Sequence, residues 1–315
     1  MTMLAVCGKA RRQVKRTGWM CTRRPCDSRC MLRLRYALAL LLLAAPALAG
    51  GRLEFRSFRP AALEGAKKDC RVYFPASYDA PESRERRYPV IVFLHGWPGS
   101  EGNWPGQGRA LQTLDQMSAA GEIPEVIALF PDGGGTGMLG RSIWLNAAGG
   151  KSNMEDYVVH DLPAWADSTL RTRPGPRWRG VIGLSDGATA AVNFVLRHPD
   201  VFGACGAHSG DFRLRKDMSS GRVFGDEPGA TRLRAEYSPL EYLPRVAAAA
   251  KSQESVIYFD CGTDDESMAD NRELDAMMTK LGVPHVFHEF PGSHDWGYWR
   301  THLHESLRTV TSRMR

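Results

Sequence analysis

The pentapeptide GLSDG, residues 183–187, constrains the fold more than any other stretch of this chain. It follows an apolar run (178–184) that favours a β-strand and precedes a run of small residues (188–196) that favours a helix. Glycines on either side of Ser185 let strand and helix backbones approach closely and favour a tight turn with the serine at its tip. A bare G-x-S-x-G pattern often arises by chance, so the rest of the chain decides whether Ser185 is a nucleophile.

From residue 50 onward, strand-like and helix-like runs alternate, which predicts an α/β fold with a mostly parallel central sheet and helices on both faces. Residues 53–58 and 70–74 are the expected opening strands, antiparallel at one edge. Residues 89–94 are continuously apolar, as expected for a central strand covered on both faces. Further strands are expected at 125–130, 178–184, 202–207, 256–260 and 286–290, and helices at 107–120, 154–170, 188–196, 239–251, 266–281 and 296–314.

Two long segments lack this periodicity. Residues 132–152 are rich in Gly and Ser and predict a long loop, which in a compact domain is usually functional or disordered. Residues 209–238 are polar and irregular, and we interpret them as a small cap over the site. Pro163 predicts a kink or break in the helix at 154–170. No repeat or linker divides residues 50–315, which are expected to form one domain.

Positive charge is concentrated at the start of the chain. The sequence of 315 residues has 41 Lys and Arg, 35 Asp and Glu, and a net charge of +6. Residues 1–49 hold ten of these bases and one of the acids, which leaves 31 bases and 34 acids, a balance of −3, from residue 50 onward. A nucleic-acid partner therefore has no electrostatic support.

Residues 31–49 have the pattern of a secretory signal peptide. Arg33 and Arg35 supply the charged start, residues 37–45 are apolar, and ALA at 47–49 is a small-x-small cleavage site. The apolar run is too short for a comfortable transmembrane helix and no comparable run follows, so no stable membrane insertion is expected after cleavage.

This leader predicts a secreted or periplasmic protein that starts at Gly50. Met31 is then the expected start of translation, and residues 1–30 form an upstream extension of doubtful reality. The alternative is a long basic leader. The part from Gly50 onward keeps an odd number of cysteines, which we expect to be buried free thiols, with one bridge as the alternative: Cys70, Cys205 and Cys261.

Residues later in the chain could activate Ser185. A serine hydroxyl is a weak nucleophile until a base accepts its proton and a third group orients that base. In α/β-hydrolase folds the order is serine, acid, histidine, each in a loop after a later strand. His294 occupies such a loop after the last expected strand. Three acids follow the preceding strand, where they could also cap the next helix, and chain order does not choose among them: Asp264, Asp265 and Glu266.

An oxyanion hole would need two backbone N–H donors. The residue after the nucleophile, Asp186, is the expected first donor. The loop HGWPG, residues 95–99, follows a central strand, and we assign the second donor to the N–H of Trp97. Gly96 lets the backbone turn close to the substrate, and His95 is expected to hydrogen-bond within the structure rather than act as a second base.

Aromatic side chains near these loops are candidates for substrate binding. Trp97, Trp104, Trp144 and Trp296 lie in or beside the expected site loops and could stack on an aromatic acyl group or a sugar, with His95 beside them. Loop tryptophans are also common hydrophobic anchors, so both interpretations stand. No metal or cofactor is implied.

Several stretches together resemble the esterase D-like (putative esterase) branch of the α/β-hydrolases. Bacterial feruloyl-esterase modules look closest, because they pair a C-G-T-x-D acid loop with a G-x-H-D histidine loop. The resemblance covers nearly all of residues 70–310. The matching stretches are FLHGWPGSEGNW (93–104), MEDYVVHDLPAWADSTLRT (154–172), GLSDGATAAVNFVLRHPDVFGACGAHSG (183–210), CGTDD (261–265) and FPGSHDWGYWR (290–300).

The resemblance implies an α/β-hydrolase fold with Ser185 as nucleophile, Asp265 as acid and His294 as base, and it favours Asp265 over Asp264. It also exposes a departure, because family members commonly carry Met after the nucleophile, where this chain has Asp186. That carboxylate could repel anionic acyl groups, raise the pKa of His294 or point into solvent.

The expected function is a secreted serine carboxylic-ester hydrolase with an acyl-enzyme intermediate. Its expected substrates are small-molecule or polysaccharide-linked esters, namely aryl, feruloyl or acetyl esters of carbohydrates outside the cell. The alternatives are a mycolyltransferase-like acyltransferase, a peptidase of the same fold, and a non-catalytic carbohydrate-binding protein.

Overall fold

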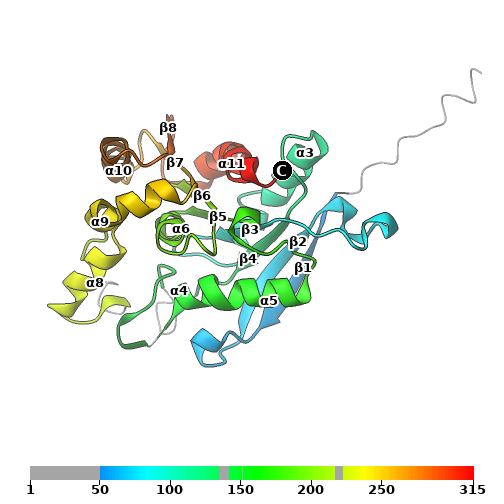
Figure 1. Cartoon of the computed structure of the whole chain (residues 1–315), viewed down its shortest axis with the longest axis horizontal. Coiled ribbons are helices and arrows are strands. Elements are labelled where there is room, and N and C mark those ends of the chain that lie inside the picture. The colour runs from blue at the N-terminus through cyan, green and yellow to red at the C-terminus, as the bar shows by residue number, and fades with distance from the viewer. Residues whose placement is uncertain (1–49, 135–141, 151, 217–222) are drawn as a thin grey trace, which may run out of the picture. The chain divides into compact units, whose positions relative to one another are not determined.

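An eight-stranded sheet runs through the part of the chain that the computed structural model describes, residues 50–134, 142–150, 152–216 and 223–315 (Figure 1). The strand order is β1-β2-β4-β3-β5-β6-β7-β8. β2 is antiparallel to β1 and to β4, and β3 to β8 are parallel, as predicted. The strands are β1 (Arg52–Phe58), β2 (Lys68–Phe74), β3 (Val90–Leu94), β4 (Ile127–Pro131), β5 (Arg179–Leu184), β6 (Ala204–His208), β7 (Val256–Gly262) and β8 (Val286–Phe290).

Helices cover both faces of the sheet (Figure 1). Residues of α3 and α11 pack on one face, and residues of α5, α6, α9 and α10 pack on the other. The helices are α2 (Asn103–Gly106), α3 (Ala110–Ala119), α4 (Met154–Asp156), α5 (Leu162–Thr169), α6 (Asp186–Arg197), α8 (Gly229–Tyr237), α9 (Pro239–Ser252), α10 (Met268–Leu281) and α11 (Trp296–Val310).

Alternation along β3 explains the two apolar layers. Successive strand side chains point to opposite faces, so Val90, Val92 and Leu94 join one hydrophobic cluster while Ile91 and Phe93 join the other. All five side chains are buried. A continuous apolar run thus forms a central strand covered on both faces, as its sequence predicts.

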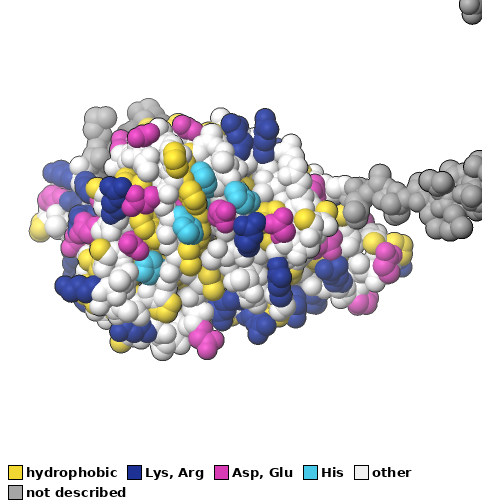
Figure 2. Space-filling view, turned by 90° about the horizontal axis from the view of Figure 1, so that it is seen from above, with side chains coloured by type: hydrophobic (Ala, Val, Ile, Leu, Met, Phe, Trp, Pro, Cys, Tyr) yellow, Lys and Arg dark blue, Asp and Glu magenta, His cyan; other side chains and the backbone are white. Residues whose placement is uncertain are grey.

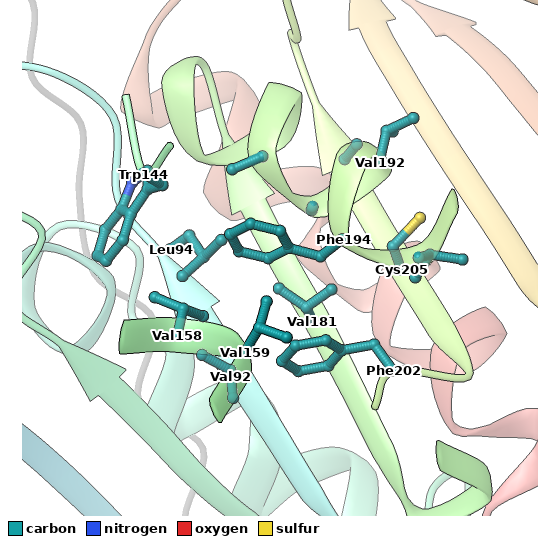
Figure 3. Packing of buried hydrophobic residues seen from close by; sticks show 14 of the residues in the cluster. Val92, Leu94, Trp144, Val158, Val159, Val181, Val192, Phe194, Phe202 and Cys205 are labelled. Atoms are coloured by element: carbon teal, nitrogen blue, oxygen red, sulfur yellow. The ribbon is translucent and has the colours of Figure 1, made fainter. Parts of the chain in front are cut away.

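Helix α6 lies against the middle of the sheet and fixes the turn that precedes it. Phe194 of α6 stacks on Phe202 with ring centroids 6.0 Å apart, beside Val92 and Val181 (Figure 3). Ten consecutive residues of α6, 187–196, are buried. Burial on this scale holds the start of α6 rigidly at the end of β5.

Two predicted segments differ from expectation. The helix expected at 154–170 does not break at Pro163. A π-helical turn (Tyr157–Asp161) joins α4 to α5, with the Leu162 N–H bonded to the Tyr157 carbonyl five residues back, and Pro163 lies in the first turn of α5, where proline is tolerated. The expected cap is not irregular throughout, because it contains α8, which packs on α9.

The three cysteines of the described residues are buried and free, as expected. They lie on β2, β6 and β7, and burial raises the pKa of each thiol, that of Cys205 to about 12. The predicted leader (31–49) and the upstream extension (1–30) lie outside the described residues, as do 135–141, 151 and 217–222 of the predicted loop and cap.

The described surface mixes both signs of charge. Figure 2 shows Lys and Arg interspersed with Asp and Glu over one face, with histidines gathered among hydrophobic side chains. In the part of the chain that the structure describes, no helix is both long and apolar enough to cross a membrane.

Candidate active site

Three loops at the carboxyl ends of parallel strands bring Ser185, His294 and Asp265 together. Ser185 follows β5, Asp265 follows β7 and His294 follows β8. The Ser185 hydroxyl lies 3.0 Å from His294 Nε2. On the other side of the ring, His294 Nδ1 lies 3.1 Å and 3.0 Å from the two carboxylate oxygens of Asp265. One imidazole therefore connects the hydroxyl to the carboxylate.

Ser185 occupies a strained backbone conformation. Its φ of 53° and ψ of −122° lie outside the regions that a non-glycine residue normally adopts. The Ser185 N–H donates to the carbonyl of His208 on β6, and its own carbonyl accepts from the first turn of α6. The strand on one side and the helix on the other hold the serine at the tip of the turn, as the pentapeptide predicts.

The glycines of the pentapeptide are required by close backbone contacts. A Cβ at Gly183 would lie 2.0 Å from the Gly187 carbonyl oxygen, and a Cβ at Gly187 would lie 2.5 Å from the Leu94 carbonyl oxygen. Real Cβ atoms do not come so close to backbone atoms. The motif therefore sets the separation of β3, β5 and α6, and with it the position of Ser185.

Gly183→Ala is accordingly expected to destabilise the fold, because strand and helix backbones would have to separate. We expect a loss on the order of 2–3 kcal/mol in the free energy of unfolding, measured by urea denaturation. The matched control is Gly229→Ala in α8, where a Cβ would meet nothing within 4 Å. Equal stability of the two variants would contradict the proposed contact.

Hydrogen bonds keep the Asp265 carboxylate charged. Burial alone would raise its pKa, but donors from the His294 ring, the Ser267 N–H (2.8 Å) and the Ser209 hydroxyl outweigh burial and lower the pKa below 3.8. Asp264 and Glu266 are exposed, whereas Asp265 is buried. Among the three acids that chain order left open, the structure brings Asp265 alone onto the imidazole.

The surrounding carboxylates make His294 a stronger base. Burial alone would lower its pKa, but the hydrogen bond and charge of Asp265, together with the charges of Asp211 and Glu266, raise the pKa above 6.5. His294 is half-buried, so its Nε2 edge can still meet a substrate. The ring can accept a proton from Ser185 while Asp265 fixes the other nitrogen.

The loop after β3 lies directly beside Ser185. A Cβ at Gly96 would lie 2.9 Å from the Ser185 Cβ, so only glycine fits here. Trp97 and Asp186, whose N–H groups are the expected oxyanion donors, line one small cavity of about 20 Å³ with His95. Asp186 is the first residue of α6, and the backbone N–H groups in the first turn of a helix have no acceptor within the helix.

Two of the tryptophans expected to bind substrate do not face it. Trp104 and Trp144 are 1% and 2% exposed, and their indole N–H groups donate to the Leu94 and His95 carbonyls at 2.9 Å and 2.8 Å. They anchor the loop that carries Trp97, so the prediction of stacking is wrong for both. Figure 3 shows Trp144 turned toward Leu94 in the core.

His95 is also a structural residue. Its Nδ1 lies 2.8 Å from the Gly96 carbonyl, to which it donates, and its Nε2 accepts from the Gly133 N–H at 3.0 Å. Burial lowers its pKa, which favours this neutral form. Both ring nitrogens are engaged within the protein, so the expectation that His95 hydrogen-bonds within the structure is confirmed, and the expectation that it contacts substrate is wrong. Trp97, 49% exposed, and the half-buried Trp296 remain able to contact a ligand.

Sequence reasoning missed three residues that surround this site: Ser209, Asp211 and Trp299. Ser209 and Asp211 follow β6 at the same edge of the sheet, a position that the carboxyl-end rule could have flagged. No sequence pattern marks Trp299 as a site residue apart from its position one turn into α11. No group of three or more His, Cys, Asp or Glu suited to a metal occurs among residues that the structure describes.

The strand order, the strained serine and the neighbouring histidine define the class of the fold as an α/β-hydrolase. Residues 62–310 match the family model described as "Putative esterase". Because this match spans most of the chain, the chain belongs to that esterase family.

Curated relatives carry matching names. An esterase of Mycobacterium tuberculosis is 24% identical over 269 residues, which cover 77% of this chain and 56% of that protein. This chain thus spans little more than half the length of that relative. An endo-1,4-beta-xylanase/feruloyl esterase of Xylanibacter ruminicola is 30% identical over 158 residues, covering 49% of this chain and 21% of that protein.

Solved structures agree on the fold. A ferulic acid esterase has a TM-score of 0.75 and 25% identity over 84% of this chain and 99% of that one. The S-formylglutathione hydrolase of Staphylococcus aureus has a TM-score of 0.69 and 18% identity over 84% of this chain and 100% of that one, a likeness that speaks for the fold alone.

Proposed function

We propose that this chain is a secreted serine esterase that forms an acyl-enzyme at Ser185. The observation that carries the proposal is the continuous hydrogen-bonded connection from the Ser185 hydroxyl through the His294 ring to Asp265, with distances of 3.0 and 3.0–3.1 Å. Nucleophile, base and orienting carboxylate at these distances are what acyl transfer to a serine requires.

The reaction would proceed in two halves. Ser185 Oγ attacks the ester carbonyl carbon while its proton passes to His294 Nε2, and the Trp97 and Asp186 N–H groups bind the oxyanion. His294 then gives the proton to the leaving alcohol. In the second half, His294 deprotonates a water that attacks the acyl carbon, the bond from that carbon to Ser185 Oγ breaks, His294 returns the proton to Ser185 Oγ, and the acid leaves. Asp265 stabilises the imidazolium in both halves.

We propose aryl, feruloyl or acetyl esters of carbohydrates as the substrate class. Trp97 and Trp296 offer aromatic surface near the site for an aryl group or a sugar ring. Two of the similar proteins are named as esterases of ferulic acid: a ferulic acid esterase and an endo-1,4-beta-xylanase/feruloyl esterase. The predicted leader at 31–49 supports a location outside the cytoplasm, which N-terminal sequencing of the exported product would test.

A panel of feruloylated, acetylated and short-chain aryl esters tests the function directly. We expect release of the free acid from at least one class, together with covalent labelling of Ser185 by a fluorophosphonate probe. Transfer of the acyl group to an added acceptor alcohol in preference to water would instead indicate an acyltransferase. A folded protein that neither hydrolyses these esters nor reacts with the probe would refute the proposal.

The pH dependence of kcat/KM should report the raised pKa of His294. The base must be neutral to accept the Ser185 proton, so activity falls as pH falls through that pKa, and the midpoint of the acid limb is expected above pH 6.5. The carboxylates whose charges raise this pKa are Asp265, which bonds the ring, and Asp211 and Glu266.

Asp211→Asn removes one of these charges and should move the acid limb to lower pH. Asp275→Asn, whose carboxylate bonds the distant His285 at 2.9 Å, is the matched control and should leave the limb in place. An acid limb that does not respond to Asp211→Asn would show that this carboxylate has no influence on the base.

A further inference from the structure

Ser209 directly follows β6, at the edge of the sheet that carries the site, and is fully buried. Its hydroxyl accepts a hydrogen bond from the indole N–H of Trp299 at 3.0 Å. An indole nitrogen can only donate, and a carboxylate can only accept. The Ser209 O–H can therefore donate on its other side, and this hydroxyl is one of the hydrogen-bonding groups that lower the pKa of Asp265. The Ser209 hydroxyl thus lies between the Trp299 indole of α11 and the influence of Asp265, the orienting acid.

The backbone of Ser209 is an independent sign of a functional constraint. Its φ is 58°, in the left-handed region that glycine adopts without strain. A non-glycine residue held there is costly and persists only where the surroundings compensate. Its N–H donates to the Asp260 carbonyl at 2.8 Å, which continues the pairing of β6 with β7. The hydrogen bonds of the hydroxyl offset the strain that glycine would avoid.

Trp299 contacts both Ser209 and the ring of the base, His294. Besides its bond to Ser209, its ring stands at 86° to the ring of His294, with centroids 5.0 Å apart. Trp299 is 6% exposed and packs edge-on against Trp296 at 5.3 Å. The indole is thus fixed in the protein, and it limits rotation of the imidazole on one side while it orients the Ser209 hydroxyl on the other.

We propose that Ser209 and Trp299 are positioning residues that fix the Asp265 carboxylate and the His294 ring relative to Ser185, an inference that rests on the proposed function. Neither residue is placed to touch the reacting ester bond. Their removal should therefore reduce the rate of the chemical step and leave substrate binding largely unchanged.

Three variants test this inference: Ser209→Ala, Ser209→Gly and Trp299→Phe. Both Ser209 variants lose the hydroxyl, but glycine also relieves the backbone strain. We expect each of them to lower kcat on the order of 10- to 100-fold with KM little changed. Trp299→Phe keeps an aromatic ring without the donor and should lower kcat in the same direction. The double variant Ser209→Ala/Trp299→Phe should lose less than the product of the two single losses.

A matched control separates positioning from general destabilisation. Ser238→Ala removes another fully buried serine hydroxyl, which bonds the Arg234 carbonyl and the Leu214 N–H, and should leave kcat unchanged. Recovery of kcat in Ser209→Gly but not in Ser209→Ala would overturn the inference, because only the backbone would then matter. So would an unchanged kcat in both folded Ser209 variants.

A second readout does not depend on ester hydrolysis. The far-downfield proton NMR signal of His294 Nδ1–H reports its hydrogen bond to Asp265, and Ser209→Gly should shift or broaden this signal. If wild type hydrolyses no ester, the proposed function fails while this signal still tests the positioning. An identical signal in wild type and Ser209→Gly would overturn the inference even in an active enzyme.

Discussion

Ser185→Ala is expected to abolish ester hydrolysis, with kcat reduced on the order of 10⁶-fold. The variant removes the hydroxyl that lies 3.0 Å from His294 Nε2 and leaves the imidazole without a nucleophile to activate. Labelling by a fluorophosphonate probe should disappear as well. Rates of p-nitrophenyl acetate hydrolysis and mass spectrometry of the probe adduct measure the two effects.

The fold of Ser185→Ala should remain intact. Alanine has the same backbone preferences as serine at a φ of 53°, and the backbone hydrogen bond to the His208 carbonyl stays. An unchanged thermal midpoint would therefore attribute the loss to chemistry. Ser252→Ala, an exposed serine of α9, is the control that should keep full activity. Substantial hydrolysis by Ser185→Ala would refute the assignment of the nucleophile.

Asp265→Asn should lower kcat about 10⁴-fold while the protein stays folded. The amide has nearly the shape of the carboxylate, but it no longer carries the charge that stabilises the imidazolium, and its NH₂ group can hold the ring in the wrong tautomer. The loss should therefore fall on kcat more than on KM. Steady-state kinetics with one aryl ester suffices for the measurement.

The neighbouring carboxylate provides the sharpest control for Asp265→Asn. Asp264 is adjacent in sequence but exposed, and the His294 ring bonds Asp265 instead. Asp264→Asn should keep activity close to that of wild type. If Asp264→Asn lost as much activity as Asp265→Asn, the orienting acid would have been assigned to the wrong residue.

The strands and the order of the site loops could be predicted because both follow from local patterns. Strand-like runs predicted all eight strands of the described sheet, with ends displaced by up to two residues at β2, β4, β6 and β7. Helix α8 could not be predicted. Its buried residues are only Ala230, Arg234 and Tyr237, and Arg234 is held by an ion pair with Glu227, so no apolar stripe marks the helix.

Site residues could be predicted where the order of strands and loops along the chain fixes their position. They could not be predicted where the direction of the side chain decides whether a residue faces the site. Ser185 and His294 follow from a motif and a loop position. The choice of Asp265 needed the family resemblance, because Asp264 and Asp265 differ only in burial, which tertiary packing sets. Trp104 of α2 and Trp144 of a loop both lie near the site in sequence, yet their rings are buried in the core, and no local sequence pattern predicts that direction.

The buried thiols of Cys70, Cys205 and Cys261 supply the protein with internal reporters of local unfolding. Since each lies on a different strand and its raised pKa keeps it protonated, an alkylating reagent can react only when that strand separates from its neighbours. In a protein that starts at Gly50, the modification rates of the three residues would thus compare the opening of the antiparallel edge with that of the strands beneath the site.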